Sequence, residues 1–401
     1  MKQIPYGRHS IDQDDIREVV RVLRSDWITQ GPKVKEFEEN LARYCGARYA
    51  LAVSSGTAAL HLAALVLGLR PSDEVITTAV TFSATANAVL YAGAHPVFTD
   101  IDAFTRNISP AKIEGKISSK TKALIPVHFA GLPCDMGAIY ELARKNNLTV
   151  IEDACHALGA QYRVNGRWQK IGSCSHSDMT IFSFHPLKSI TTGEGGAITT
   201  NDKKLFERLL LLRNHGISRD EGKFLKPYED LCAAGPWYYK MQELGFNFRI
   251  SDIQCALGIS QLKKIPRFLK RREEIARCYS SGFSGITEIG LPVSGNEVKS
   301  AWHLFSIAVK EEGMKRRVPA GAARNNLYLF LHKKGIRAQV HYIPVYLHPF
   351  YRHLGYKPGL CPEAERFYRQ ALSLPLYPAL SDSQVRFVIR AVKDYYCKER
   401  I

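Results

Sequence analysis

The residue in this sequence that is best suited to covalent chemistry is Lys188, which lies in the run of residues 180–200. An apolar, strand-like stretch leads into it, and a glycine-rich turn with a second strand-like stretch follows. This context holds one amine at a rigid strand end, beside small residues that leave room for a flat ring. A lysine that forms an imine with a carbonyl cofactor needs such a setting. The alternative is a surface lysine between two strands, and the run alone does not separate the two interpretations.

Two further segments could bind an anion and a flat ring. Residues 54–59 (Ser-Ser-Gly-Thr-Ala-Ala) stand between an expected strand and an expected helix, where Gly56 permits a tight turn. The amides that follow would point out of the helix N-terminus, and Thr57 adds a hydroxyl, which together suit a phosphate. The same residues could instead be an ordinary helix cap. Phe82 follows another expected strand, where its ring could stack on a cofactor or simply belong to the core.

A carboxylate and a histidine follow the strand-like run at 149–152. Asp153 would be buried at the end of this strand, which is costly unless the carboxylate meets a cation or a strong donor. A protonated ring nitrogen is such a partner, and capping of the next helix is the structural alternative. His156 comes one helical turn later, where it could hydrogen-bond a ring oxygen or serve as a packing residue.

Alternating strand-like and helical patterns through the first half of the chain would position these residues. This alternation predicts an α/β domain with a large, mainly parallel sheet, and ligands of such sheets gather beyond the carboxyl ends of the strands. The expected strands are 49–53, 74–78, 96–100, 123–127, 149–152, 179–184 and 196–200. The expected helices between them include 57–69, 84–92 and 136–146.

After about residue 201 the pattern changes to longer helices and a smaller α+β unit. In that unit the expected strands are 306–309 and 338–341, and the expected helices are 320–334, 363–372 and 381–393. We therefore predict three parts, which are an N-terminal arm (1–30), a large domain (31–245) and a small C-terminal domain (246–401).

The bulk composition argues against several other classes of protein. The chain has 401 residues, a formal net charge of +17 and 9 scattered cysteines without a Cys-x-x-Cys pair, which predicts free thiols and no metal site. The positive charge favours anionic partners such as nucleotide-linked metabolites. The basic residues are not interleaved with aromatic ones, so we expect no nucleic-acid partner. No apolar run reaches membrane-spanning length and no signal-peptide pattern opens the sequence, so we expect a cytoplasmic protein without a membrane partner.

Together the segments offer a phosphate cradle, a ring stack, an acid for a ring nitrogen and an amine, in order on successive strand ends. In this combination the sequence resembles the fold-type I pyridoxal 5′-phosphate (PLP) aminotransferases of the DegT/StrS sugar-aminotransferase family, from Ile4 to the C-terminus. The segments that carry the resemblance are residues 55–60, 152–154, 183–188 and 192–196. The resemblance implies transfer of an amino group, usually from L-glutamate, to a keto sugar. Sugar dehydrases of the family carry histidine at the lysine position, so Lys188 favours transamination.

The resemblance also assigns the contacts of the cofactor ring. Lys188 would form the imine with PLP, Asp153 would pair with the ring nitrogen, and His156 would lie near the ring hydroxyl. Phe82 would stack on the ring.

The phosphate contacts follow from the same resemblance. Gly56, Thr57 and Ser183 would bind the phosphate within one chain. Asn247 would reach the phosphate of the neighbouring subunit, which implies an obligate homodimer with shared active sites.

The acceptor sugar is suggested by the arm. Residues 4–11 and 25–32 resemble the flagellin-sugar branch of the family, which aminates UDP-4-keto-6-deoxy-N-acetyl-β-L-altrosamine on the route to pseudaminic acid. Possible substrate contacts carried over in this way are Tyr6, Arg213, His303 and His341, each of which could instead be a packing or surface residue. The alternatives are 4-amination of UDP-4-keto-6-deoxy-GlcNAc or of a dTDP- or GDP-linked 4-keto sugar, and a regulatory binding module on the same fold.

Overall fold

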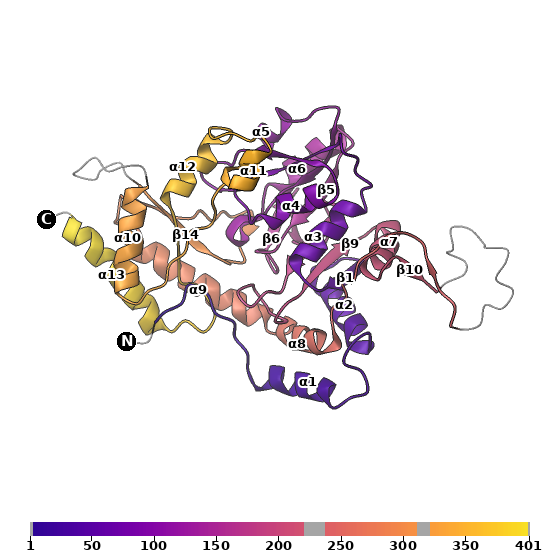
Figure 1. Ribbon diagram of the computed structural model, residues 1–401. Coiled ribbons are helices and arrows are strands. Elements are labelled where there is room, and N and C mark those ends of the chain that lie inside the picture. Colours follow the sequence, from indigo (N-terminus) through magenta and orange to yellow (C-terminus); the bar gives the residue numbers. More distant parts are fainter. Residues whose placement is uncertain (1–2, 220–236, 311–320, 400–401) are drawn as a thin grey trace.

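A seven-stranded sheet forms the centre of the molecule, in a computed structural model that describes residues 3–219, 237–310 and 321–399 (Figure 1). Its strand order is β1-β9-β8-β5-β4-β2-β3. The strands are β1 (Tyr49–Val53), β2 (Glu74–Thr78), β3 (His95–Thr99), β4 (Thr121–Ile125), β5 (Thr149–Asp153), β8 (Met179–Ser183) and β9 (Gly196–Thr200). Only β9 runs antiparallel to its neighbours, β1 and β8, and the other pairs are parallel. The predicted α/β fold with a mainly parallel sheet is confirmed.

Helices cover both faces of this sheet, which is why most residues of its strands are buried. One face packs against α3 (Gly56–Leu65), α4 (Ala84–Tyr91) and α7 (Lys203–Arg213) through buried residues such as Leu51 and Ile151. The other face packs against α2 (Pro32–Cys45), α5 (Pro110–Glu114), α6 (Met136–Lys145) and α8 (Asp252–Leu262) through residues such as Ala50 and Val150. Consecutive strand residues therefore face opposite layers, as the pleat requires.

The C-terminal part has its own buried cluster, which is joined to the first by the long helix α9 (Ile265–Phe283; Figure 1). A three-stranded sheet of β12 (Ile289–Gly290), β14 (Phe305–Val309) and β15 (Ala371–Leu374) packs with α10 (Ala322–Lys333) and α13 (Asp382–Glu399). Along α9, Phe268 belongs to the core of the large sheet and Ile275 to the core of the small one. The predicted boundary at 245/246 lies before this change, because α8 packs on α2, and the three-part division stays a prediction.

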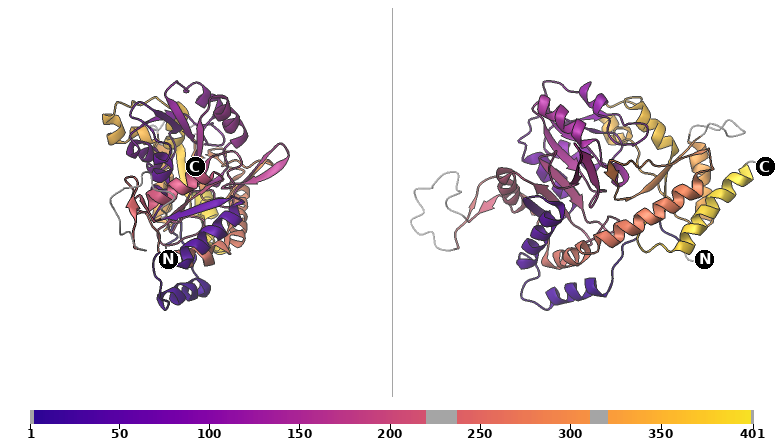
Figure 2. Two further views of the ribbon diagram at one scale, coloured as in Figure 1. Left: turned by 90° about the vertical axis from the view of Figure 1, so that its right-hand side faces the viewer. Right: turned by 180° about the vertical axis from the view of Figure 1, so that it is seen from behind.

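The N-terminal segment crosses from one part to the other. The Ile4 amide donates to the Gly335 carbonyl at 2.9 Å, beside the small sheet, and α1 (Gln13–Leu23) then packs on α8. In Figures 1 and 2 the helix α1 accordingly lies outside the main body, alongside α8. Asp12 starts α1 by accepting hydrogen bonds from the amides of Asp14 and Asp15.

Several predicted elements differ from those observed. Residues 338–341 form no strand and make a single bridge, between Gln339 and Ser373, while the predicted helix 363–372 ends at α12 (Pro362–Gln370) and gives way to β15. A hairpin of β6 (Gln161–Val164) and β7 (Arg167–Lys170), which pairs with β13 (Val298–Lys299), was not predicted, although residues 161–164 alternate polar and apolar and Asn165-Gly166 is typical of a hairpin turn. The remaining described elements are β10 (Ile217–Ser218), β11 (Lys240–Met241), α11 (Pro349–His353) and the 3-10 helices Phe129–Gly131 and Val345–Leu347.

Candidate active site

A cavity of about 600 Å³ opens at the carboxyl ends of β5 and β8. This volume is large enough for a cofactor and part of a substrate. Ten of the predicted site residues line it, and these are Tyr6, Gly56, Thr57, Phe82, Asp153, His156, Ser183, Lys188, His303 and His341. The chain thus brings together residues from both cores and from the arm.

One end of the cavity is built to hold an anion. Gly56 and Thr57 open helix α3, where the first amides have no acceptor within the helix, and the Ser55 hydroxyl accepts from the Ala58 amide at 3.0 Å. Ser183, the last residue of β8, lies against them. A Cβ atom on Gly56 would come within 2.8 Å of the Ser183 Cβ, so only glycine lets the helix start approach the strand this closely.

The carboxylate of Asp153 is held at the end of β5, with only 4 % of the residue exposed. Thr85 donates its hydroxyl to Oδ2 at 2.7 Å, and the Cys155 amide donates to Oδ1 at 3.1 Å. Two fixed donors orient the group, and the remaining lone pairs suit a cationic N–H partner. Thr85 had not been predicted, because a threonine inside an apolar helix gives no sequence signal.

The amine of Lys188 belongs to the same cavity. Burial lowers the pKa of Lys188, and the neighbouring Cys155 and Asp153 side chains only partly oppose this effect. A lysine with a lowered pKa has more of the neutral amine that attacks a carbonyl carbon.

Three histidines form one wall of the cavity. The rings of His156 and His303 lie 4.3 Å apart, and Nδ1 of each is buried without a hydrogen-bond partner among the described residues. Burial lowers the pKa of His156 and of His303 well below the ordinary value, and lowers that of His341 to about 4, so all three rings are neutral near pH 7. The hydroxyl of Tyr342 lies 3.1 Å from Nε2 of His156. Tyr342 also lines the cavity and had not been predicted.

Two predicted residues lie elsewhere. Arg213 donates to Oε1 of Glu38 at 2.5 Å and to the Ala52 carbonyl at 2.7 Å, which ties the end of α7 to α2 and β1. Arg213 does not line the cavity of its own chain, and its predicted contact with the substrate stays a prediction. Asn247 is exposed and bridges Asn214, away from this cavity, so its predicted reach into a neighbouring subunit stays a prediction.

The model of the DegT/DnrJ/EryC1/StrS aminotransferase family matches residues 9–393. The chain belongs to this family. The spore coat polysaccharide biosynthesis protein SpsC of Bacillus subtilis is 42% identical over 393 residues, which are 98% of this chain and 96% of SpsC. The UDP-4-amino-4,6-dideoxy-N-acetyl-beta-L-altrosamine transaminase of Campylobacter jejuni is 38% identical over 404 residues, covering 98% of this chain and 100% of that protein.

Solved structures agree with this membership. Helicobacter pylori PseC, an aminotransferase involved in the biosynthesis of pseudoaminic acid, superposes with a TM-score of 0.88 at 33% identity, covering 98% of this chain and 99% of PseC. The PLP form of Spr1654 from Streptococcus pneumoniae, described as a sugar aminotransferase, has a TM-score of 0.88 at 32% identity, with 99% of both chains covered. The chain is therefore a sugar aminotransferase, and its cofactor is PLP.

The residues of the cavity fit this cofactor. Because Gly56 lies close to Ser183, the start of α3 forms a cradle for a phosphate. The oriented oxygens of Asp153 can accept a hydrogen bond from a ring nitrogen. Phe82 is 60 % exposed and lines the cavity, so its ring is accessible to a cofactor. The unpartnered Nδ1 atoms of His156 and His303 mark a wall whose polar atoms are not all satisfied by the protein.

Two features are absent from residues 3–219, 237–310 and 321–399. No cluster of three or more His, Cys, Asp or Glu side chains there could hold a metal ion. None of the helices in those ranges combines the length and apolar character of a membrane span.

Proposed function

We propose that this chain transfers an amino group from L-glutamate to C4 of a UDP-linked 4-keto-6-deoxy N-acetyl hexose, in the biosynthesis of pseudaminic acid for flagellin. The observation that carries the proposal is the convergence of Lys188, Asp153 and the start of α3 on one cavity. The similarity to the Campylobacter jejuni transaminase and to Helicobacter pylori PseC supports the choice of sugar. Family membership and the intact Lys188 set aside a purely regulatory binding module.

The side chains of the cavity have distinct tasks in this reaction. PLP, when bound, supplies an electron sink for the negative charge that develops at the α-carbon of the amino donor. Asp153, held by Thr85 and the Cys155 amide, would keep a proton on the ring nitrogen. Lys188 would hold the aldehyde carbon in the resting protein. Once the amine of the donor has displaced it, the free Lys188 amine, with its lowered pKa, would take the proton from the donor α-carbon.

The acceptor side of the cavity is neutral and aromatic. Tyr6 lies 5.6 Å from His341 between ring centroids, and both line the cavity together with His303. We assign these three residues to the sugar, since neutral imidazole and phenol groups donate and accept hydrogen bonds to hydroxyl and keto oxygens. Tyr6 comes from the arm, and His303 and His341 come from the C-terminal part. These two parts of the chain therefore close the cavity around an acceptor.

The proposed assembly is a homodimer in the cytoplasm. In it Asn247, exposed on its own chain, would complete the phosphate site of the partner. No nucleic acid or membrane partner is proposed.

The acceptor is tested by offering the purified holoenzyme L-glutamate with a panel of 4-keto-6-deoxy sugars linked to UDP, dTDP or GDP. We expect the UDP-linked altrosamine precursor to give the highest kcat/KM, with the 4-amino product identified by mass and by NMR stereochemistry. A preference for UDP-4-keto-6-deoxy-GlcNAc would favour the alternative 4-aminotransferase reaction on that sugar. A preference for a GDP sugar would overturn the assignment of the acceptor while leaving the transamination intact.

A further inference from the structure

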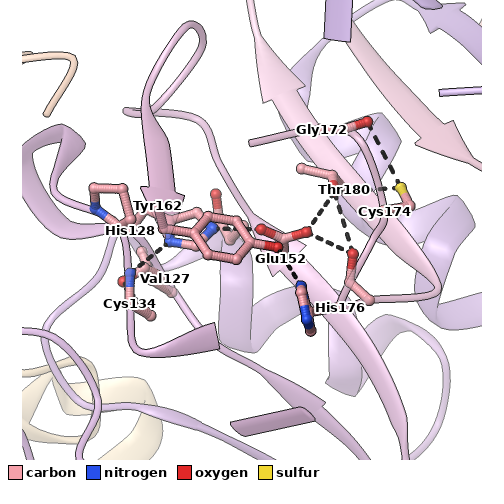
Figure 3. Close-up of polar contacts among 12 residues, drawn as sticks. Val127, His128, Cys134, Glu152, Tyr162, Gly172, Cys174, His176 and Thr180 are labelled. Atoms are coloured by element: carbon pink, nitrogen blue, oxygen red, sulfur yellow. Dashed lines mark hydrogen bonds and ion pairs between the residues drawn. The ribbon is translucent and has the colours of Figure 1, made fainter. Parts of the chain in front are cut away.

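A buried carboxylate, that of Glu152, lies on the face of the sheet opposite to Asp153. Figure 3 shows the polar contacts around it. Glu152 is only 1 % exposed, and its neighbour His128 is fully buried. Nε2 of His128 lies 2.8 Å from Oε2 of Glu152, while Oε1 accepts hydrogen bonds from the hydroxyls of Ser177 at 2.5 Å and Thr180 at 2.8 Å. None of these four side chains lines the catalytic cavity.

The hydrogen bonds fix the protonation of this pair. The amide of Cys134 donates to Nδ1 of His128 at 3.0 Å, so Nδ1 carries no proton and the ring is neutral, with its N–H at Nε2. That N–H and the two hydroxyls all donate to Glu152, which has the pattern of an ionised carboxylate. Burial alone would raise the pKa of Glu152, but the hydrogen bonds from His128, Ser177 and Thr180 hold it below the ordinary value.

Glu152 and Asp153 are consecutive residues of β5, so their side chains point to opposite faces of the sheet. Val150 and Ile151, two residues earlier, belong respectively to the two buried clusters on these faces. Asp153 therefore faces the cavity, whereas Glu152 faces the layer that contains α2, α6 and α8. The carboxylate of Glu152 can affect the reaction only through the backbone or through its field.

The backbone connection is direct. The His128 amide donates to the Asp153 carbonyl at 3.1 Å, and the Asp153 amide donates to the Pro126 carbonyl at 2.9 Å. A hydrogen bond from His128 to Glu152 therefore closes a loop around the peptide groups that carry Asp153. Ser177 and Thr180 add β8, the strand that ends in Ser183.

His128 is also connected to His303, through the turn that follows it in the chain. Residues 129–131 follow His128 as a 3-10 turn, and the Ala130 carbonyl accepts from the His303 amide at 2.9 Å. Gly131, at φ +93°, allows this turn to pass so close to the His156 carbonyl that a Cβ would lie 2.9 Å from it. The turn thus touches the backbone of two cavity histidines.

We propose that Glu152 and His128 are positioning residues of the active site, whose buried hydrogen bond fixes the backbone that presents Asp153 and His303 to the cofactor and substrate. The pair touches neither ligand, and it acts by holding the ends of β4, β5 and β8 in one arrangement. Loss of the pair should loosen the contact to the ring nitrogen and weaken cofactor binding.

Two substitutions of Glu152 distinguish the effect of its hydrogen bonds from the effect of its charge, and a third substitution, at Asp252, serves as the control. In Glu152→Gln the amide oxygen can accept from His128 while the NH2 group donates to Ser177 and Thr180, so the hydrogen bonds survive and the charge is lost. Glu152→Ala removes both. Asp252→Ala is the matched control, because Asp252 is fully buried and accepts from the Gly31 and Lys33 amides but does not line the cavity.

The measurements are the affinity of the apoprotein for PLP and the pH midpoint of the visible absorbance band of the resting holoenzyme, neither of which uses the acceptor sugar. For Glu152→Ala we expect affinity to fall about tenfold and the midpoint to move, because a buried donor loses its acceptor beside Asp153. Glu152→Gln should stay within about twofold of wild type, since its hydrogen bonds are kept. Asp252→Ala should lose stability and change neither readout.

Each other outcome counts against the proposal. Wild-type affinity and midpoint in Glu152→Ala would overturn it, and equal damage in Glu152→Gln would show that the charge, rather than the hydrogen bonds, matters. If Glu152→Ala does not fold, Thr180→Val, which removes one of the three donors, takes its place. A smaller shift of the same two readouts is then expected, and no shift would overturn the proposal.

Discussion

Replacing Gly56 with alanine tests how the anion site is built. The added Cβ would lie 2.8 Å from the Ser183 Cβ, 3.2 Å from its Oγ and 3.4 Å from the Cys155 Sγ. Since carbon atoms pack at about 3.5–4.0 Å, the start of α3 and the end of β8 must separate by roughly 1 Å. Overpacking of this kind costs about 1–3 kcal/mol in the free energy of unfolding. Loss of one charge-assisted hydrogen bond to the phosphate would lower PLP affinity about tenfold to a hundredfold.

The assay is a titration of the apoprotein with PLP, followed by absorbance, beside urea unfolding of the same samples. Gly285→Ala is the control, because nothing lies within 4 Å of the Cβ it would add. The double variant Gly56→Ala with Ser183→Gly removes the 2.8 Å clash, so it should regain stability but not affinity, since the Ser183 hydroxyl is lost as well. Wild-type affinity in Gly56→Ala would refute the close approach of α3 to β8 as the basis of the phosphate site.

Two further predictions concern residues in and beside the cavity. His341 has a pKa of about 4 in the folded chain, while an unfolded histidine takes up a proton near pH 6.5. The free energy of unfolding should therefore fall as pH drops from 6.5 to 4, by up to about 3 kcal/mol, and His341→Gln should flatten that slope in pH-dependent urea melts. Arg213→Met should cost about 3 kcal/mol of stability, because it leaves Glu38 buried without its partner, with the KM for the keto sugar unchanged. A raised KM would instead support the predicted contact of Arg213 with the substrate.

The sequence predicted the site residues that lie at the ends of strands. The observed strands β1 and β9 have the predicted bounds, and β5 and β8 differ by one residue each, because short apolar runs bounded by turn residues indicate strands. With the strand ends located, the rule that ligands gather there predicted a ligand site at Asp153. Ser183 was predicted only from the family resemblance, and Lys188 lines the same cavity from the turn that follows β8 and not from a strand end.

Contacts between residues that lie far apart in the sequence could not be predicted from short apolar runs. Tyr342 reaches His156 only because the C-terminal part folds back over the large sheet, and Thr85 reaches Asp153 from an otherwise apolar helix. The segment 338–341 has the composition of a strand, yet it gains only one bridge since it lines the cavity instead of joining a sheet. In the sequence, Arg213 is only a charged residue at a helix end. Its ion pair with Glu38 is seen only in the folded structure.

The central claim, that the amine of Lys188 carries the cofactor, is tested most directly by reducing the PLP-loaded protein with borohydride and mapping its peptides by mass. We expect the visible absorbance band to disappear and a single phosphopyridoxyl group to remain on the peptide that contains Lys188, with neither band nor label in Lys188→Ala. A label on another lysine, or amination of the sugar by Lys188→Ala at the wild-type rate, would contradict the account.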